Sequence, residues 1–183
     1  MSRSIEVKNV VANTKIADEI DLKDLSAKLE GSDYNKERFP GVVYRISEPR
    51  AVFLIFSSGK VVTTGASSVE SVYVAIDNLI EEFTEIGIDI VDEVEVTIQN
   101  IVSTADTGSK FLDLNSIALG LGLENIEYEP EIFPGLVYRM SDPKVVILVF
   151  GSGKLVITGA KKIEDCKRAL DQLIQELEGI GLL

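Results

Sequence analysis

The chain has 183 residues, of which 45% are hydrophobic and 26% charged, and its formal net charge at pH 7 is −12. It has no histidine, which excludes the usual general base and the Ser-His and Cys-His nucleophile pairs, and its single cysteine, Cys166, excludes an internal disulfide. No apolar run approaches the roughly 20 residues of a membrane span, and the N-terminus shows no signal-peptide pattern. We therefore expect a cytoplasmic, intracellular globular protein that is not an enzyme.

The first half of the chain predicts strands joined by short links. Alternating and helical spacings of apolar residues predict strands near 5–12, 42–47, 51–56 and 60–64, and helices near 21–30 and 68–86. Glu48-Pro49 and Ser57-Ser58-Gly59 link the last three strands, and links this short make hairpins. We therefore predict an antiparallel sheet with helices on one side, which is the α+β class.

The same pattern occurs a second time. FPGVVYRISEPRAVFLIFSSGKVVTTGA begins at Phe39, and FPGLVYRMSDPKVVILVFGSGKLVITGA begins at Phe133. From these two residues to Gly87 and Gly181, 26 of the 49 aligned positions are identical. VKNVV near the start likewise corresponds to IQNIV. We therefore predict two similar halves, residues 1–90 and 91–183, related by a pseudo-twofold axis.

The strands carry apolar residues on both faces. In AVFLIFSSGK, Ala51, Phe53 and Ile55 lie on one face, and the residues between them lie on the other. Each half offers one long helix and one short one, and these can cover only one face. The opposite face is therefore predicted to be uncovered, and an apolar patch of that extent marks an interface or a binding surface.

The positions of phenylalanine and of the charged residues support a binding surface. Phe39 and Phe56 are predicted to lie together at the hairpin end away from Glu48-Pro49, and Phe133 and Phe150 repeat this arrangement. The strand segments carry an excess of basic residues, whereas the long helix of the first half carries only acidic ones. Because local potential steers a ligand, the negative net charge does not exclude an anionic partner.

The duplicated pattern FPG…YR…P(K/R)…F.SGK…TGA, with N(V/I)V in the first strand of each half, resembles the TATA-box-binding protein family over essentially the entire chain. The acidic composition and the lack of a long low-complexity extension are more similar to archaeal members. The resemblance implies a saddle, with a curved ten-stranded antiparallel sheet and four helices on its convex face. It also implies a general transcription initiation factor that binds the minor groove of the A·T-rich TATA box, kinks the promoter DNA and needs no cofactor.

The resemblance also implies which residues bind DNA. In the first half, the positions that match the DNA-contacting positions of the family are Asn9, Val11, Phe39, Arg45, Leu54, Phe56, Ser58, Lys60, Val62 and Thr64. In the second half they are Asn100, Val102, Phe133, Arg139, Leu148, Phe150, Ser152, Lys154, Val156 and Thr158. The phenylalanine pairs are the implied wedges between base steps.

Partners follow from the same resemblance. Glu129, Glu131 and Ile132 match the loop that binds transcription factor B, which together with RNA polymerase completes the promoter complex. A nucleoid-associated location is implied as well. The alternative hypothesis is a non-enzymatic interaction protein whose apolar sheet face binds a peptide or a second copy, and a homodimer without DNA is compatible with both. Phenylalanine wedges and basic rims at both ends favour DNA.

Overall fold

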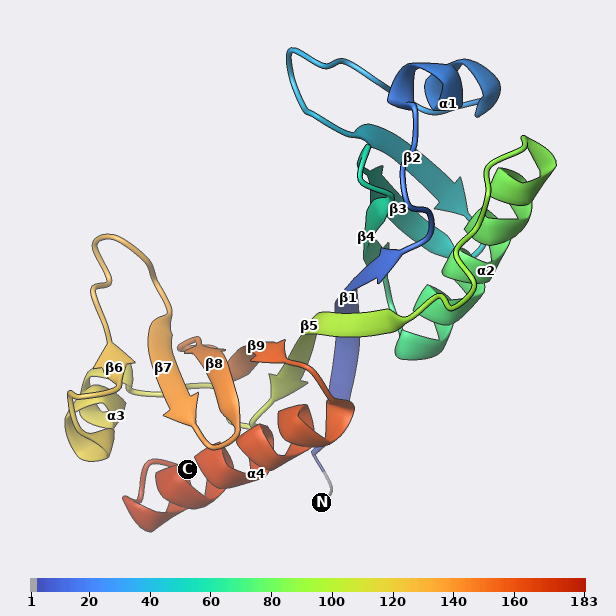
Figure 1. Cartoon of the computed structure of the whole chain (residues 1–183). Helices are drawn as coiled ribbons and strands as arrows, with labels where there is room; N and C mark the ends of the chain where they lie inside the picture. Colours follow the sequence, from blue (N-terminus) through green and yellow to red (C-terminus); the bar gives the residue numbers. More distant parts are fainter. Residues whose placement is uncertain (1–2) are drawn as a thin grey trace. The chain divides into compact units, whose positions relative to one another are not determined.

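The computed structural model describes residues 3–183, which contain nine strands and four helices. The chain forms two compact units (Figure 1). One unit comprises Asn9–Gln99, and the other comprises Asn100–Leu183 together with the described residues before Asn9. Strands β1 and β5 each cross from one unit into the other.

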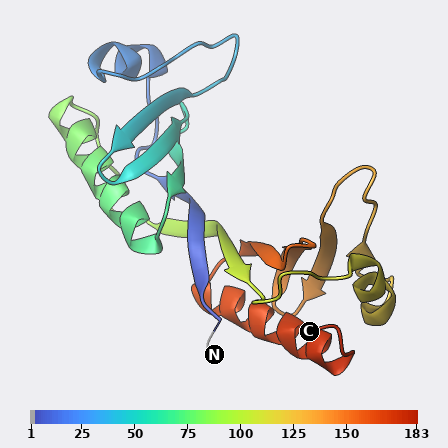
Figure 2. The ribbon, with the colours of Figure 1, turned by 180° about the vertical axis from the view of Figure 1, so that it is seen from behind.

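The Asn9–Gln99 unit contains four antiparallel strands in the order β2-β3-β4-β1. Its elements are β1 (Ile5–Lys15), α1 (Leu22–Lys28), β2 (Val42–Ser47), β3 (Arg50–Ile55), β4 (Lys60–Ala66) and α2 (Val69–Glu85). The carboxylate of Asp21 caps α1 by accepting from the backbone N–H groups of Lys23 and Asp24, and the hydroxyl of Ser68 caps α2. Helix α2 lies along one side of strands β2–β4 (Figure 2).

The second unit repeats this order as β5-β9-β8-β7-β6, again antiparallel. Its elements are β5 (Val96–Asp106), α3 (Leu114–Leu121), β6 (Ile126–Glu127), β7 (Leu136–Ser141), β8 (Lys144–Val149), β9 (Lys154–Ala160) and α4 (Ile163–Gly179). The predicted α+β class with antiparallel strands and four helices is therefore confirmed.

The strand count differs from the expected ten in the described residues. In the second unit, β6 pairs Ile126 and Glu127 with β7. The corresponding place in the first unit holds a single bridge between Asp33 and Val43. Ile126 is buried, whereas Ser32 stands at its position and turns its hydroxyl back to donate to the Leu29 carbonyl at 2.7 Å. Without an apolar anchor, this segment does not continue as a strand.

Each unit builds its core between the long helix and one sheet face. The α2 stripe consists of Val72, Ala75, Ile76, Leu79 and Phe83, and all five are buried. The α4 stripe consists of Cys166, Ala169, Leu170, Leu173, Ile174 and Leu177. A polar contact joins helix and sheet in both units, because the Tyr44 hydroxyl donates to Glu82 at 2.7 Å and the Tyr138 hydroxyl donates to Glu176 at 2.8 Å.

Candidate nucleic-acid interface

The face of the Asn9–Gln99 unit that points away from α2 is apolar and uncovered. On β3, Ala51, Phe53 and Ile55 are buried, whereas Val52 and Leu54 between them are half-exposed. The predicted DNA-contacting residues in this unit that are half-exposed are Asn9, Val11, Phe39, Leu54, Phe56, Val62 and Thr64. No element among residues 9–99 covers these side chains, so the prediction of an open apolar face is confirmed for this unit.

The second unit presents an equivalent face. On β8, Val145, Ile147 and Val149 are buried, and Val146 and Leu148 are half-exposed. The predicted face residues in this unit that are half-exposed are Asn100, Val102, Leu148, Phe150, Val156 and Thr158. Sequence periodicity therefore assigns the faces of both units correctly, because alternation along a strand is a local property.

The two asparagines have matching, fixed orientations. A register shift between Val10 and Ala12 removes the backbone N–H of Gly65 from the ladder, and Asn9 Oδ1 accepts from it at 2.7 Å. Asn9 Nδ2 donates to Thr64 Oγ1 at 3.3 Å. Asn100 makes the same two bonds in the second unit, to the N–H of Gly159 at 2.7 Å and to Thr158 Oγ1 at 3.2 Å.

These bonds determine what each amide offers to a ligand. Asn9 Oδ1 accepts from the Gly65 N–H and also lies 3.4 Å from Thr64 Oγ1, and Asn100 Oδ1 accepts from the Gly159 N–H and lies 3.5 Å from Thr158 Oγ1. Both acceptor sites of each oxygen are therefore engaged within the protein. The amide nitrogen carries two hydrogens, and Thr64 or Thr158 takes only one of them. Each half-exposed asparagine therefore presents a hydrogen-bond donor on a floor that is apolar apart from the neighbouring threonine.

The four predicted phenylalanines form two edge-to-face pairs. The ring centroids of Phe39 and Phe56 lie 5.7 Å apart with an interplanar angle of 63°, and those of Phe133 and Phe150 lie 5.9 Å apart at 70°. The predicted proximity within each pair is therefore confirmed. Phe133 keeps 37% of its surface exposed.

A glycine makes room for each pair. A Cβ atom built on Gly41 would lie 2.8 Å from the Ile55 carbonyl oxygen and 2.9 Å from Phe39 Cε1. A Cβ atom on Gly135 would lie 2.8 Å from Phe133 Cε1 and 3.0 Å from Phe150 Cε1. The glycine of each FPG motif is thus required by the packing of the rings.

The predicted cationic residues are exposed in both units, but their surroundings differ. Arg45, Ser58 and Lys60 are exposed, and within residues 3–183 neither Arg45 nor Lys60 forms an ion pair. Ser152 is exposed as well. In the second unit, Arg139 pairs with Glu127 at 3.6 Å and Lys154 pairs with Asp106.

Sequence reasoning missed two residues of this site. Lys15 pairs with Lys60 across β1 and β4, and Asp106 pairs with Lys154 across β5 and β9. Lys15 lies six residues after Asn9, and Asp106 lies six residues after Asn100, so alternation places both on the uncovered faces. The signal was available, but the first strand was predicted to end near residue 12, whereas β1 continues to Lys15.

Hydrogen bonds and burial shift the pKa values of an aspartate on the open face and of two tyrosines at the helix–sheet contact. The hydrogen bond from Lys154 and the backbone N–H of Gly108 lower the pKa of Asp106, so its carboxylate is ionised at neutral pH. Burial and the neighbouring Glu82 raise the pKa of Tyr44 to about 12, and burial and Glu176 raise the pKa of Tyr138 to about 12. Both tyrosines lie at the helix–sheet contact, and at neutral pH their phenol groups are uncharged and donate hydrogen bonds to the helix.

The predicted partner loop is a short exposed turn. Both Ile132 and Phe133 donate their backbone N–H groups to the Glu129 carbonyl at 2.9 Å. Ile132 keeps 81% of its surface exposed, and the side chains of Glu129 and Glu131 are also exposed. The turn thus presents an apolar side chain beside two carboxylates.

Residues 3–183 offer neither a metal site nor a membrane-spanning helix. No group of His, Cys, Asp or Glu side chains in this range is arranged to hold a metal ion. None of the helices in this range combines the length and the apolar character needed to cross a bilayer.

The two units carry matching open faces, each with an amide donor and an aromatic pair, which is the arrangement expected of a nucleic-acid-binding protein. The family model described as transcription factor TFIID, or TATA-binding protein, matches residues 4–86 and 95–180. The chain therefore belongs to the TATA-binding protein family, as its sequence indicated. This membership also bears out the prediction that it is not an enzyme.

Relatives in archaea are similar over the full chain. A TATA-box-binding protein of Methanothrix thermoacetophila is 56% identical over 184 residues, covering 100% of both chains. TATA-box-binding protein 1 of Methanosarcina acetivorans is 54% identical over 180 residues, covering 98% of both. The solved structure of Methanococcus jannaschii TBP matches with a TM-score of 0.86 and 50% identity, covering 96% of this chain and 99% of that one. The predicted archaeal type is thus confirmed.

Proposed function

We propose that the chain is a general transcription factor that binds the minor groove of the TATA box, and that its two repeats, residues 1–90 and 91–183, form one continuous saddle on the DNA. The observation that carries the proposal is the duplicated open face, apolar in the middle, with one asparagine donor and one phenylalanine pair in each copy. The relatives that are named TATA-box-binding proteins support it.

The chemistry of the open face favours A·T base pairs. The minor groove offers acceptors at adenine N3 and thymine O2, and the Nδ2 groups of Asn9 and Asn100 are donors. Guanine adds an amino donor in this groove. An apolar floor of Leu54, Val62, Leu148 and Val156 would bury that donor without a partner, which costs about 1–3 kcal/mol.

The phenylalanine pairs are suited to act as wedges. Apolar side chains inserted between base steps unstack them and bend the duplex toward the major groove. Phe39 with Phe56 and Phe133 with Phe150 are partly exposed aromatic pairs in which each ring supports the other. We propose that both pairs insert and kink the DNA. Arg45, Lys60, Arg139 and Lys154, with Ser58 and Ser152, contact the backbone, which sets position and affinity but not sequence preference.

Recruitment would use the exposed turn of the second unit. Its two carboxylates and the 81% exposed Ile132 fit a partner surface that combines basic and apolar groups. We propose that Glu129, Glu131 and Ile132 bind transcription factor B, through which RNA polymerase joins the promoter. The protein then works at the nucleoid, in the cytoplasm.

A titration of end-labelled duplexes tests the proposal. Energy transfer between the ends reports bending of a TATA-like duplex and of a G·C-rich duplex of equal length. We expect tight binding and shortening with the TATA-like duplex alone. Alanine at Phe56 and Phe150 should reduce bending while leaving the fold intact. Equal binding of both duplexes without shortening would contradict the proposal.

The second candidate function is self-association or peptide binding through the same apolar faces. The half-exposed positions of β3, β4, β8 and β9 favour it, because monomers rarely expose apolar patches above a few hundred Å². We propose that any homodimer of the free protein uses these faces, so that DNA and a second copy compete. Sedimentation of the protein with and without the TATA-like duplex tests this competition, because a homodimer that uses these faces should dissociate when the duplex binds.

A further inference from the structure

The residue six positions after the face asparagine has opposite charges in the two units, since it is Lys15 in β1 and Asp106 in β5. Lys60 begins β4 and Lys154 begins β9, each four residues after the phenylalanine that precedes the hairpin turn. Lys60 has Lys15 as its cross-strand neighbour, whereas Lys154 has Asp106. All four side chains are exposed. A phosphate that approaches this corner therefore meets two ammonium groups in one unit, and an ammonium paired with a carboxylate in the other.

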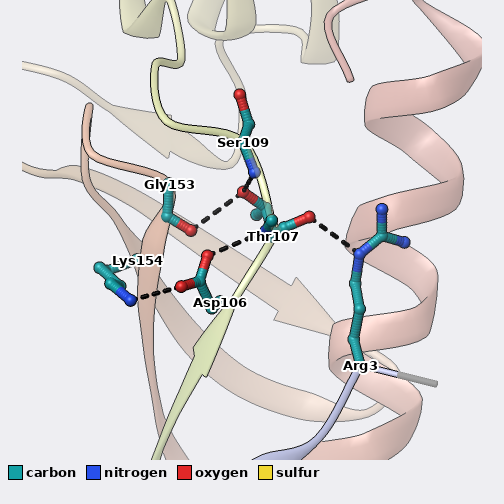
Figure 3. Close-up of polar contacts among 7 residues, drawn as sticks. Arg3, Asp106, Thr107, Ser109, Gly153 and Lys154 are labelled. Atoms are coloured by element: carbon teal, nitrogen blue, oxygen red, sulfur yellow. Dashed lines mark hydrogen bonds and ion pairs between the residues drawn. The ribbon is translucent and has the colours of Figure 1, made fainter. Parts of the chain in front are cut away.

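The Asp106–Lys154 pair is held in place by its surroundings (Figure 3). Lys154 Nζ donates to Asp106 Oδ2, and the backbone N–H of Gly108 donates to Asp106 Oδ1 at 2.9 Å. The next residue, Thr107, donates from its backbone N–H and its hydroxyl to the Gly153 carbonyl, at 2.9 and 3.0 Å. The Asp106 carboxylate is thus anchored beside the turn that leads into Lys154.

The neighbourhood of Lys15 and Lys60 is built differently. These two lysines line a groove of about 640 Å³, and the acidic side chains that line it are Asp18, Glu93 and Glu95. The single ion pair found here among residues 3–183 joins Lys15 to Asp18 at 3.9 Å. The Asp18 side chain is 94% exposed. Lys60 itself contacts no carboxylate within 4.0 Å in the described part of the chain, so its ammonium is available.

We propose that Asp106 weakens the backbone contact of the second unit, because its anchored carboxylate occupies the Lys154 ammonium that a DNA phosphate would bind. Lys15 and Lys60 then make the stronger phosphate contact, and Lys15 is an additional DNA-contacting residue. The two near-identical halves hold DNA unequally for this reason. The inference rests on the proposed function, since it concerns the same DNA-binding face.

The test is Asp106→Asn, measured on the TATA-like duplex at several salt concentrations. Asparagine keeps an oxygen for the Gly108 N–H but loses the charge that holds Lys154. The Asp106–Lys154 pair is exposed, and exposed ion pairs are weak and screened by salt, so the effect of losing it should be modest. We expect the affinity for the TATA-like duplex to rise about three- to tenfold at 0.1 M salt. A lysine that is free to neutralise one more phosphate should also steepen the slope of log K against log salt by about 0.9.

Glu6→Gln is the matched control. Glu6 pairs with Lys8 at 2.8 Å, but alternation along β1 places it on the face opposite Asn9. Its substitution changes the net charge equally, and it should leave DNA affinity and the salt slope nearly unchanged.

Removal of each lysine amine provides a second comparison. Lys154→Ala should cost little in the native background and more in the Asp106→Asn background, whereas Lys15→Ala and Lys60→Ala should each cost more than Lys154→Ala.

The outcomes separate this inference from the proposed function. If the native chain fails to bind and bend the TATA-like duplex, both are overturned. If the native chain binds but Asp106→Asn binds equally or more weakly, only the inference fails, and Asp106 then positions Lys154 for its phosphate. Equal gains on TATA-like and G·C-rich duplexes support the inference, because phosphate contacts carry no sequence information. A thermal unfolding midpoint equal to that of the native chain shows that the fold is intact.

Discussion

The side-chain carbonyl oxygen of Asn9 accepts a hydrogen bond of 2.7 Å from the backbone N–H of Gly65. Gly65 adopts a φ of 85°, which an L-residue with a side chain rarely takes, and the register shift beside it leaves its N–H without a ladder partner. Asn9 therefore supplies the acceptor that the Gly65 N–H lacks in the ladder, and its amide nitrogen remains as a donor for the open face. The bond of Asn100 to Gly159 repeats the relationship at the same distance.

The first prediction follows from this relationship. Asn9→Asp keeps an acceptor for the Gly65 N–H but loses the donor hydrogens, so stability should change little. Binding of the TATA-like duplex should weaken about tenfold or more, because a donor to adenine N3 or thymine O2 is replaced by a negative charge. Fluorescence titration measures the affinity, and thermal unfolding measures the stability. Asn9→Ala should in addition destabilise the fold, and unchanged DNA affinity of the Asp variant would contradict the assigned role.

The second prediction concerns the glycines under the phenylalanine pairs. Gly41→Ala places a Cβ atom against the Ile55 carbonyl and the Phe39 ring, and Gly135→Ala does so against both rings of its pair. Each substitution should lower the free energy of unfolding by about 1–3 kcal/mol through overpacking and should reduce DNA bending. Thermal unfolding and end-to-end energy transfer measure the two effects. Gly179→Ala is the control, because the added atom meets nothing within 4 Å apart from the backbone of its own helix and its chain neighbours.

The third prediction is a dependence of stability on alkaline pH. The pKa of Tyr138 is about 12 in the folded chain, above its ordinary value of 10.0. The folded state therefore favours the neutral phenol, so the stabilisation is complete below pH 10 and is lost as pH rises toward 12. Tyr138→Phe should cost about 1 kcal/mol at pH 7 through the lost hydrogen bond to Glu176.

Urea unfolding of the native chain and of Tyr138→Phe from pH 7 to 12 measures this dependence. The difference between the two curves should shrink between pH 10 and 12. Tyr44→Phe should behave alike, since Tyr44 makes the same contact with Glu82. A difference that stays constant across this range would show that ionisation of the phenol is not coupled to folding.

The fourth prediction concerns a buried hydroxyl. Thr63 Oγ1 is buried and has no hydrogen-bond partner among residues 3–183. Thr63→Val keeps the shape and removes the unpaired polar atom, so the free energy of unfolding should rise by about 1 kcal/mol. Chemical denaturation measures it. In contrast, the adjacent Thr64→Val removes a hydroxyl that is bonded to Asn9, and it should bring no gain in stability and should weaken DNA binding.

The sequence by itself determined the duplication, the hairpins and the two faces of β3, β4, β8 and β9. These depend on local rules: Val52 and Leu54 alternate with buried neighbours because successive residues of a strand point to opposite sides, and a two-residue link can join only antiparallel strands. The same local rules placed Phe39 beside Phe56 and Phe133 beside Phe150, as the structure confirms.

Only the tertiary structure decided the contacts that depend on register between distant strands. The bond from Gly65 to Asn9 requires a one-residue shift between β1 and β4, and the pairing of Asp106 with Lys154 requires a given alignment of β5 and β9. The single Asp33–Val43 bridge in place of a tenth strand also depends on tertiary packing, because only the folded chain shows that Ile126 of β6 is buried whereas Ser32 at the equivalent place is not. These contacts join residues that are 10 or more positions apart in the chain. The sequence pattern does not fix the register of the paired strands to the exact residue, and a shift of one residue changes which side chains meet.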